Sequence, residues 1–138
     1  QLDPGDGMII GVDLKKDISV LEAAYNDRQG VTAQFNKNIL CHINHKLDAN
    51  FNLSNFRHEA FYNEEKGRIE MHLISSLNQT VTIEEQVFPF EKGESIHTEN
   101  SYKYNIAEFD NLVNTWFSVE KIWTDANDYF SIQYLQKK

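Results

Sequence analysis

The feature that most constrains the fold is a short, continuous run of apolar residues near the start of the sequence, Met8 to Leu14. Turn-forming residues precede it, and Lys15-Lys16-Asp17 ends it. Such runs are typical of strands buried on both faces, usually in a parallel sheet that helices cover. A parallel strand needs parallel neighbours, and no strand pattern precedes this one. The sequence therefore predicts a strand from the later part of a larger α/β protein.

Two helical patterns and then an alternating pattern follow this strand. The helical patterns are Ile18 to Asp27 and Val31 to Leu47, and the second has an apolar stripe of six residues: Val31, Phe35, Ile39, Leu40, Ile43 and Leu47. From Phe56 to Tyr104 apolar and polar residues alternate as in strands, with Pro89 indicating an edge or a bulge. We expect an antiparallel meander next to two helices, which is a small α+β lobe.

The remaining sequence returns to helical spacing and ends in two strand patterns. Asn105, with Glu108 three residues later, predicts a capped helix start. Val119 to Trp123 and Tyr129 to Leu135 predict closely spaced strands, typical of the closing edge of an α/β sheet with an antiparallel last strand. The sequence thus predicts three parts, with the middle one inserted as a lobe between two parts of one sheet: residues 1–14, 15–104 and 105–138.

The composition excludes several kinds of partner. The 138 residues, 41% of them hydrophobic, suit one domain or two small lobes. The net charge of −8, from 21 acidic and 13 basic residues, disfavours nucleic acid and anionic membrane, which bind clustered Lys and Arg. No apolar run approaches the roughly 20 residues that span a bilayer, and nothing resembles a signal peptide. Cys41 is the only cysteine, so we expect no intramolecular disulfide and a cytoplasmic location.

One extended stretch, Glu94 to Tyr104, carries the polar residues best suited to a binding site. Side chains alternate along a strand, so four of them share one face: His97, Glu99, Ser101 and Lys103. A carboxylate and a hydroxyl two residues apart both reach one small polar ligand. The same alternation also fits the solvated face of an ordinary antiparallel strand. The pattern alone leaves both interpretations open.

Other candidate sites are weaker. His42 and His45 share a face of the second predicted helix, next to Cys41. Zinc needs three or four ligands, and no further partner is marked nearby, so we expect a solvated helix face and no metal site. There is no Gly-x-Ser-x-Gly elbow and no glycine-rich phosphate loop, so the sequence predicts neither a serine nucleophile nor a nucleotide loop.

Two segments of the sequence are the most specific, Gly67 to Leu73 (GRIEMHL) and Gly93 to Tyr104 (GESIHTENSYKY). They resemble the histidine-specific SAM-dependent methyltransferase family. Further segments fit in the same order and at compatible spacing: Ile10 to Asp17, Ala23 to Asp27, Phe35 to Leu40, Ile122 to Asp125, and Phe130-Ser131. The resemblance extends over nearly the whole chain, from Asp6 to Leu135.

This resemblance implies methyl transfer from S-adenosylmethionine (SAM) to the α-amino nitrogen of L-histidine, which gives the trimethylated betaine used in ergothioneine synthesis. It also implies a Rossmann-like methyltransferase domain with an inserted lobe that closes over the amino acid. On this sequence Glu99 and Ser101 would hold the imidazole ring and Met71 would pack near it. Tyr25 would reach the carboxylate or amino end. The resemblance assigns this chain no catalytic residue and no metal ligand.

The resemblance also places important parts before residue 1: the glycine-rich SAM loop, the acidic residues for ribose and adenine, and a substrate-binding asparagine. We therefore expect the C-terminal part of an enzyme, with most of the histidine pocket, no SAM-binding residue and no turnover by itself. Two alternatives stay open, a family member with another amino acid or amine as substrate, and a non-catalytic binding domain. An incomplete sheet would expose apolar edges, so we expect self-association through them.

Overall fold

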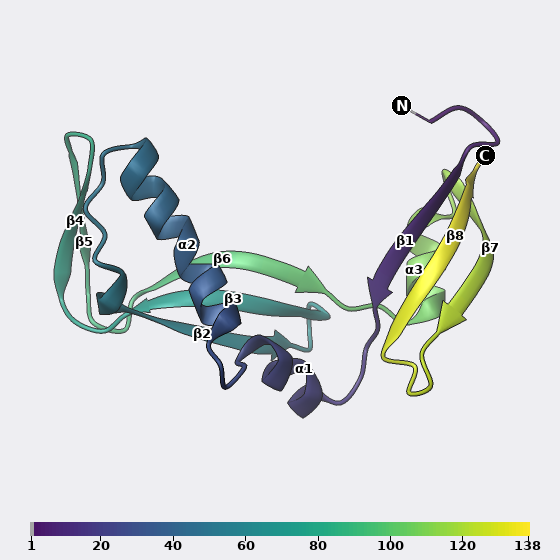
Figure 1. Cartoon of the computed structure of the whole chain (residues 1–138), viewed down its shortest axis with the longest axis horizontal. Helices are drawn as coiled ribbons and strands as arrows, with labels where there is room; N and C mark the ends of the chain where they lie inside the picture. Colours follow the sequence, from purple (N-terminus) through teal and green to yellow (C-terminus); the bar gives the residue numbers. More distant parts are fainter. Residues whose placement is uncertain (1) are drawn as a thin grey trace. The chain divides into compact units, whose positions relative to one another are not determined.

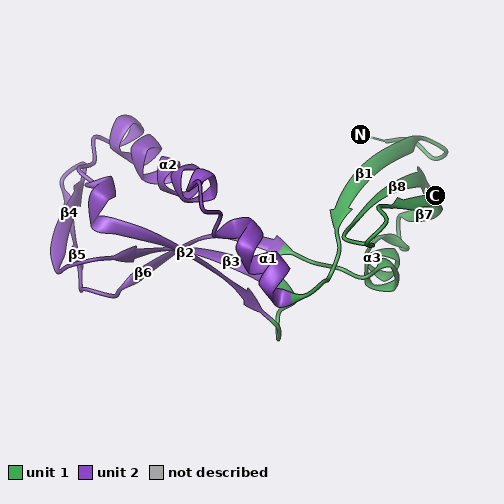
Figure 2. Ribbon diagram, turned by 60° about the horizontal axis from the view of Figure 1, so that its bottom comes forward, with its two compact units in different colours: residues 1–17, 64–68, 102–138 green, residues 18–63, 69–101 purple. Residues whose placement is uncertain are grey.

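The computed structural model describes residues 2–138 and divides the chain into two compact units (Figures 1 and 2). Unit 1 contains the described residues up to Asp17, together with Glu64–Arg68 and Tyr102–Lys138. Unit 2 contains Ile18–Asn63 and Ile69–Ser101. Each unit is therefore assembled from segments that are far apart in the sequence.

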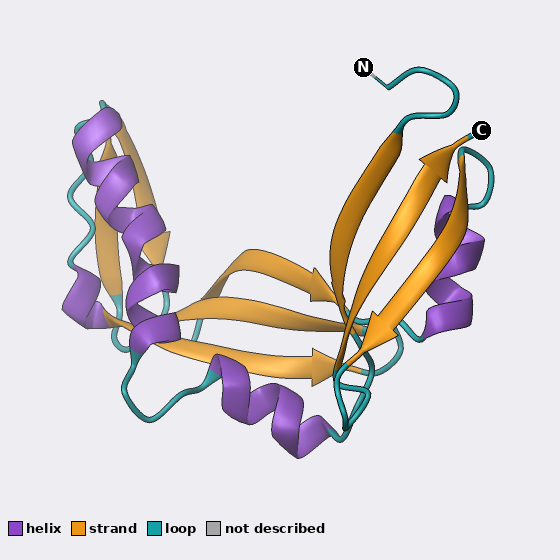
Figure 3. Cartoon of the chain, turned by 45° about the vertical axis from the view of Figure 1, so that its right-hand side comes forward, coloured by secondary structure: helices purple, strands orange, loops and turns teal. Residues whose placement is uncertain are grey.

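Unit 1 is a three-stranded antiparallel sheet with a helix on one face (Figure 3). Its strands, in spatial order, are β1 (Gly7–Asp13), β8 (Phe130–Lys137) and β7 (Phe117–Thr124), and its helix is α3 (Ile106–Val113). Both pairings that β8 makes are antiparallel, as predicted for the last strand. Four buried side chains form the core between the sheet and α3: Val12, Leu14, Phe109 and Leu135.

The start of α3 confirms the predicted capping box. The Asn105 side chain accepts a hydrogen bond from the Glu108 backbone N–H at 2.8 Å, and the Glu108 carboxylate accepts one from the Asn105 N–H at 2.9 Å. Lys15 also donates to this carboxylate. The hydrogen bond from Lys15, followed by that from Asn105, lowers the pKa of Glu108. The helix therefore begins where the sequence places it.

The burial predicted for β1 on both faces is not found. Among the described residues its one ladder partner is β8, which runs antiparallel, and Leu14 makes an isolated parallel bridge to Tyr104. Ile9 is 70% exposed, because no described element covers the sheet face away from α3. This face is apolar and partly exposed, at Ile9, Trp123, Phe130 and Ile132.

Two glycines in β1 make room for aromatic rings of β8. A Cβ on Gly11 would lie 2.6 Å from the Phe130 ring, and one on Gly7 would lie 2.6 Å from the Tyr134 ring. The rings therefore lie directly over the β1 backbone, which explains why glycine is found inside a strand.

Unit 2 combines two helices, a three-stranded sheet and a separate hairpin. In chain order its elements are α1 (Ile18–Tyr25), α2 (Val31–Lys46), the short 3₁₀ helix η1 (Leu53–Asn55), β2 (Phe56–Asn63), β3 (Arg68–Ser75), β4 (Gln79–Ile83), β5 (Gln86–Phe90) and β6 (Ser95–Tyr102). The sheet has the order β2-β3-β6, and β4 pairs with β5 alone. The prediction of one continuous meander is therefore wrong.

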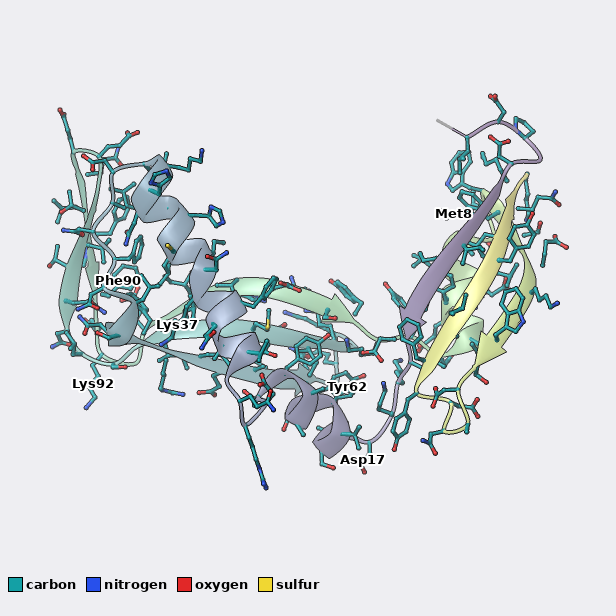
Figure 4. The ribbon with its side chains drawn as sticks, viewed as in Figure 1. Met8, Asp17, Lys37, Tyr62, Phe90 and Lys92 are labelled. Carbon is teal, nitrogen blue, oxygen red and sulfur yellow. The ribbon has the colours of Figure 1, made fainter. Side chains whose placement is uncertain are left out.

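The ends of β3 and β6 explain this difference. The Ser75 N–H donates to the Glu94 carbonyl and the Gly93 N–H donates to the Ser75 carbonyl, both at 2.8 Å. These bonds bring the start of β6 to the end of β3, so the β4–β5 hairpin leaves the sheet and returns. The hairpin packs through Val81 and Phe90 against the aromatic rings of Phe51 and Phe56; Phe90 is labelled in Figure 4.

The apolar stripe predicted on α2 is divided between two environments. Leu40 is buried against Phe51 and Phe56, but Phe35 is 63% exposed and Val31 61%. The helix residue buried beside Leu40 is polar, Asn36, at 3% exposure. The helical period was predicted correctly, but of the predicted stripe only Leu40 and Ile43 belong to the core.

Lys103 is buried in unit 1 and does not share a solvated face with Glu99. Its side chain is fully buried and its Nζ lies 2.9 Å from an Asp13 carboxylate oxygen. Lys16 also donates to Asp13, at 2.5 Å. Burial would raise the pKa of Asp13, but the hydrogen bonds and charges of Lys16 and Lys103 outweigh it and lower the pKa. The end of β1 is thereby tied to the residue that follows β6.

We predict that Asp13→Asn lowers the free energy of unfolding by about 1–3 kcal/mol, because it removes the carboxylate opposite a buried ammonium group. The pKa of Asp13 is lower in the folded protein than in the unfolded chain. Its contribution is therefore fully present above about pH 4 and is lost as the pH falls through the folded pKa. Urea unfolding at several pH values measures this. The exposed Asp110→Asn is the control, and equal effects of the two changes would contradict the prediction.

We also predict that the chain self-associates as its concentration rises, because apolar side chains cover the open face and edge of the unit 1 sheet. Light scattering over a concentration series measures the mass. Ile132→Lys should reduce association, whereas Val31→Lys, on α2, should not. A monomer at every concentration would contradict the prediction.

Candidate functional site

The open backbone edge of strand β2 is covered by two side chains, one on α1 and one on the residue that follows α1. Asn26 donates from its amide to the Ala60 carbonyl at 2.8 Å and accepts from the Ala60 N–H at 3.1 Å. Glu22 accepts from the Tyr62 N–H at 3.0 Å. These side chains therefore satisfy the outward backbone groups of a strand that is at one end of its sheet.

The turn between α1 and α2 is fixed at its other end by Asp27. Its carboxylate accepts hydrogen bonds from the backbone N–H groups of Thr32 and Val31, at 2.8 and 2.9 Å. The bond from Thr32, then that from Val31, lowers the pKa of Asp27. Gly30 has a φ of 72°, a left-handed conformation that suits glycine and lets the chain enter α2. Both ends of this turn are thus held by side chains.

Tyr25, the last residue of α1, meets Ser101 of β6. The two hydroxyl oxygens are 2.7 Å apart, within hydrogen-bond distance. The Tyr25 ring packs against a buried cluster that contains Met71, which is 2% exposed. Thr98 of β6 donates to the Met71 carbonyl at 2.9 Å, which joins the two strands there. The structure therefore brings together three of the four substrate-binding residues predicted from the sequence.

Glu99, the fourth predicted residue, is exposed and lines a different feature. It borders a hollow of about 240 Å³ between β6 and α2, lined by Phe35, Asn36, Asn38, Ile39, His42, Thr98 and Glu99. Along β6, Glu99 and Asn100 are both exposed while Ser101 is partly buried. His97 and Glu99 are thus exposed to solvent, whereas the Ser101 hydroxyl contacts Tyr25.

Three rings from neighbouring strands form a stack that the sequence analysis did not assign. The His72 ring lies between Phe61, at 5.3 Å, and His97, at 4.5 Å between centroids. His72 Nε2 lies 3.5 Å from a carboxylate oxygen of the buried Glu70. Glu70 and His72 occupy alternate positions of β3, and this spacing was the available signal. Their positions on one strand did not show that His97 would lie beside them.

Glu70, His72 and His97 offer metal-ligand atoms that lie within 4.8 Å of one another. However, the planes of the two imidazole rings are only 14° apart and stacked. The lone pairs of imidazole nitrogens lie in the ring plane, so in this arrangement they run side by side and do not converge on one ion. A metal would require one ring to turn.

The glycines of this chain do not form a SAM-binding loop. Gly7 and Gly11 lie in β1, and Gly5, Gly30, Gly67 and Gly93 lie in separate turns. A strand–loop–helix turn with clustered glycines, which positions a helix N-terminus against such a ligand, is not found among residues 2–138.

The described residues form a mixed α/β chain with antiparallel sheets, in which Tyr25 and Ser101 meet beside a buried methionine. A family model described as histidine-specific methyltransferase, SAM-dependent, matches residues 1–137. The chain belongs to this family. No helix among residues 2–138 is both long and apolar enough to cross a membrane.

Named proteins are similar to this chain over most of its length. It is 42% identical over 135 residues to the histidine N-alpha-methyltransferase of Mycolicibacterium smegmatis, covering 93% of this chain and 41% of the relative. It is 43% identical over 103 residues to the protein of that name from Mycobacterium tuberculosis, covering 73% and 32%. Ergothioneine biosynthesis protein 1 of Neurospora crassa is 32% identical over 133 residues, 93% of this chain and 15% of the relative. The chain therefore spans less than half the length of these relatives.

We predict that Asn26→Asp lowers the free energy of unfolding by about 1–2 kcal/mol, because a carboxylate would face the Ala60 carbonyl where the amide now donates. Hydrogen exchange should rise first in the amides at the end of α1. Asn100→Asp, at an exposed position of β6, is the control for the added charge. Protection of α1 that does not change in Asn26→Asp would contradict the prediction.

Proposed function

We propose that this chain is the amino-acid-binding part of a SAM-dependent methyltransferase that acts on the α-amino nitrogen of L-histidine. The contact between Tyr25 and Ser101 carries the proposal, because it joins two of the predicted substrate-binding residues from segments 76 residues apart. The family match and the names of the relatives support it. Three successive transfers would give the trimethylated betaine, in agreement with the relatives named for ergothioneine biosynthesis.

The proposed architecture is a Rossmann-like domain with an inserted lobe. Residues 1–14 and 105–138 would belong to the sheet of the methyltransferase domain, and residues 15–104 would form the lobe. The division into compact units supports this, because unit 2 lies entirely within residues 15–104 and unit 1 joins both ends of the chain. The single cysteine, Cys41, is exposed on α2 and carries no disulfide, which supports a cytoplasmic location.

The polar groups of the site suit an imidazole ring. A neutral imidazole has one N–H donor and one nitrogen that accepts. The Glu99 carboxylate would accept a hydrogen bond from the ring N–H. The Ser101 hydroxyl would donate a hydrogen bond to the other ring nitrogen, while the Tyr25 hydroxyl donates to Ser101 Oγ. Met71 would give the ring an apolar contact. An amino acid without these ring nitrogens would leave polar groups of the site unpaired, and the site would reject it.

The residues of this chain would orient the amino acid for the reaction. SAM, when bound, supplies an electrophilic methyl group on its sulfonium sulfur. Methyl transfer is an in-line displacement, so the rate depends on holding the neutral amine with its lone pair directed at the methyl carbon, opposite the sulfur. With the ring fixed by Glu99 and Ser101, the amino end has few remaining orientations, and Tyr25 would restrict them further.

We predict that Glu99→Gln weakens L-histidine binding about tenfold or more, because the amide lacks the charge that strengthens the hydrogen bond to the ring N–H. Calorimetric titration measures the affinity for L-histidine. The protein is expressed together with whatever natural sequence flanks these residues. Glu85→Gln, in the β4–β5 hairpin, is the matched control. Competition titrations against a panel of amino acids and amines, in the same calorimeter, measure the selectivity for histidine. Equal affinity for histidine in Glu99→Gln, or indifference of the wild type to histidine, would refute the proposal.

A further inference from the structure

A buried asparagine links three elements of unit 2. Asn36, on the sheet-facing side of α2, is 3% exposed. Its Nδ2 lies 2.9 Å from Nδ1 of His58 on β2 and 3.2 Å from the backbone carbonyl oxygen of His72 on β3. The amide nitrogen carries two hydrogens, so it serves both partners at once.

This arrangement determines the tautomer of His58. The His72 carbonyl only accepts, so the amide nitrogen of Asn36, and not its oxygen, must face it. The same nitrogen faces His58 Nδ1, which must therefore accept and carry no proton. The proton of the neutral ring is then on Nε2, 2.8 Å from the carbonyl oxygen of Tyr25, to which it donates.

We propose that Asn36 and His58 are positioning residues for Tyr25. The Tyr25 carbonyl is one of the last in α1, where carbonyls lack intrahelical partners, and His58 satisfies it. The hydrogen-bond series from α2 through β2 thus fixes the end of α1, and the Tyr25 hydroxyl reaches Ser101 from there. His58 does not line the hollow beside Glu99, whereas Asn36 also borders it. The inference rests on the proposed role of Tyr25 in binding histidine.

The proposal makes binding depend on the protonation of His58. A second proton on Nδ1 would face the N–H of Asn36, and the acceptor would be lost. Charged groups near the ring come from the neighbouring elements: Asp27 before α2, Lys37 on α2 (Figure 4) and Arg57 on β2. Asp27, Lys37 and Arg57 line a hollow of about 330 Å³ beside His58. A ring protonated on both nitrogens loses the bond to Asn36.

The first test uses the wild-type chain and no ligand. Imidazole ¹⁵N shifts report which ring nitrogen carries the proton, and we expect His58 to be protonated on Nε2 alone at neutral pH. Acidification should shift the Tyr25 carbonyl ¹³C resonance together with the His58 nitrogens. A proton on Nδ1 at neutral pH, or a Tyr25 carbonyl that does not follow the His58 titration, would overturn the proposal.

The second test separates positioning from substrate contact. His58→Gln places an amide N–H near the Tyr25 carbonyl and does not titrate, whereas His58→Phe removes the donor. The measurement uses the protein together with whatever natural sequence flanks these residues. We expect His58→Phe to raise KM for L-histidine about tenfold and to leave kcat within about twofold of the wild type. His58→Gln should restore most of the affinity. His45→Gln, exposed on α2, is the control.

The pH profile completes the test. Below neutral pH the wild-type KM should rise more than ionisation of the substrate explains, and in His58→Gln it should follow the substrate alone. An unchanged KM in a folded His58→Phe protein would overturn the proposal. If the wild type does not use histidine at all, the proposed function fails, while the His58 tautomer and the Tyr25 resonance still decide whether the positioning series exists.

Discussion

The structure of unit 2 depends on hydrogen bonds to the backbone groups at the open edge of β2. The outward N–H and carbonyl of Ala60 would otherwise have no partner in the sheet, since β2 is its end strand. Asn26 supplies both a donor and an acceptor to Ala60, so its side chain replaces one residue of a neighbouring strand. That contact fixes where α1 ends, and Tyr25 is the residue immediately before it. The position of the site is thus set by backbone hydrogen bonding and not by packing alone.

Asn44 has the same role in another part of the unit. It donates to the Phe51 carbonyl and accepts from the Phe51 N–H, both at 2.8 Å. An amide side chain pairs with a backbone peptide group in both directions at a small volume, which suits Asn26 and Asn44 to these positions. Asn36 differs, because its amide nitrogen only donates, and it links α2 to β2 and β3. With polar contacts holding α2, the apolar side chains of Val31 and Phe35 remain exposed.

The sequence predicts most of the elements but not which surfaces they bury. Periodicity located the helices and strands, and the spacing of Asn105 and Glu108 located the start of α3. The same periodicity predicted that Phe35 of α2 is buried and Asn36 is exposed, whereas the structure shows the reverse. A buried asparagine that bridges two strands has the same local sequence pattern as a solvated one. Lys103 was misplaced for a similar reason: its partner, Asp13, is 90 residues away and cannot be inferred from alternation along β6. Pairings between distant segments are set by tertiary contacts that local patterns do not encode.

The polar residues of β6 differ in exposure, and this difference has a consequence for the site. Glu99 and Ser101 are two residues apart on the strand, but different elements lie beside each of them. Glu99 remains exposed beside α2, while Ser101 contacts Tyr25 at the buried cluster. A ring held by both residues would then have one nitrogen toward water and the other toward the protein interior. The carboxylate would be at the solvent end, where its desolvation costs least, and the neutral hydroxyl would be at the buried end. This division of polar groups suits a small ligand that is itself neutral in the ring and charged at its other end.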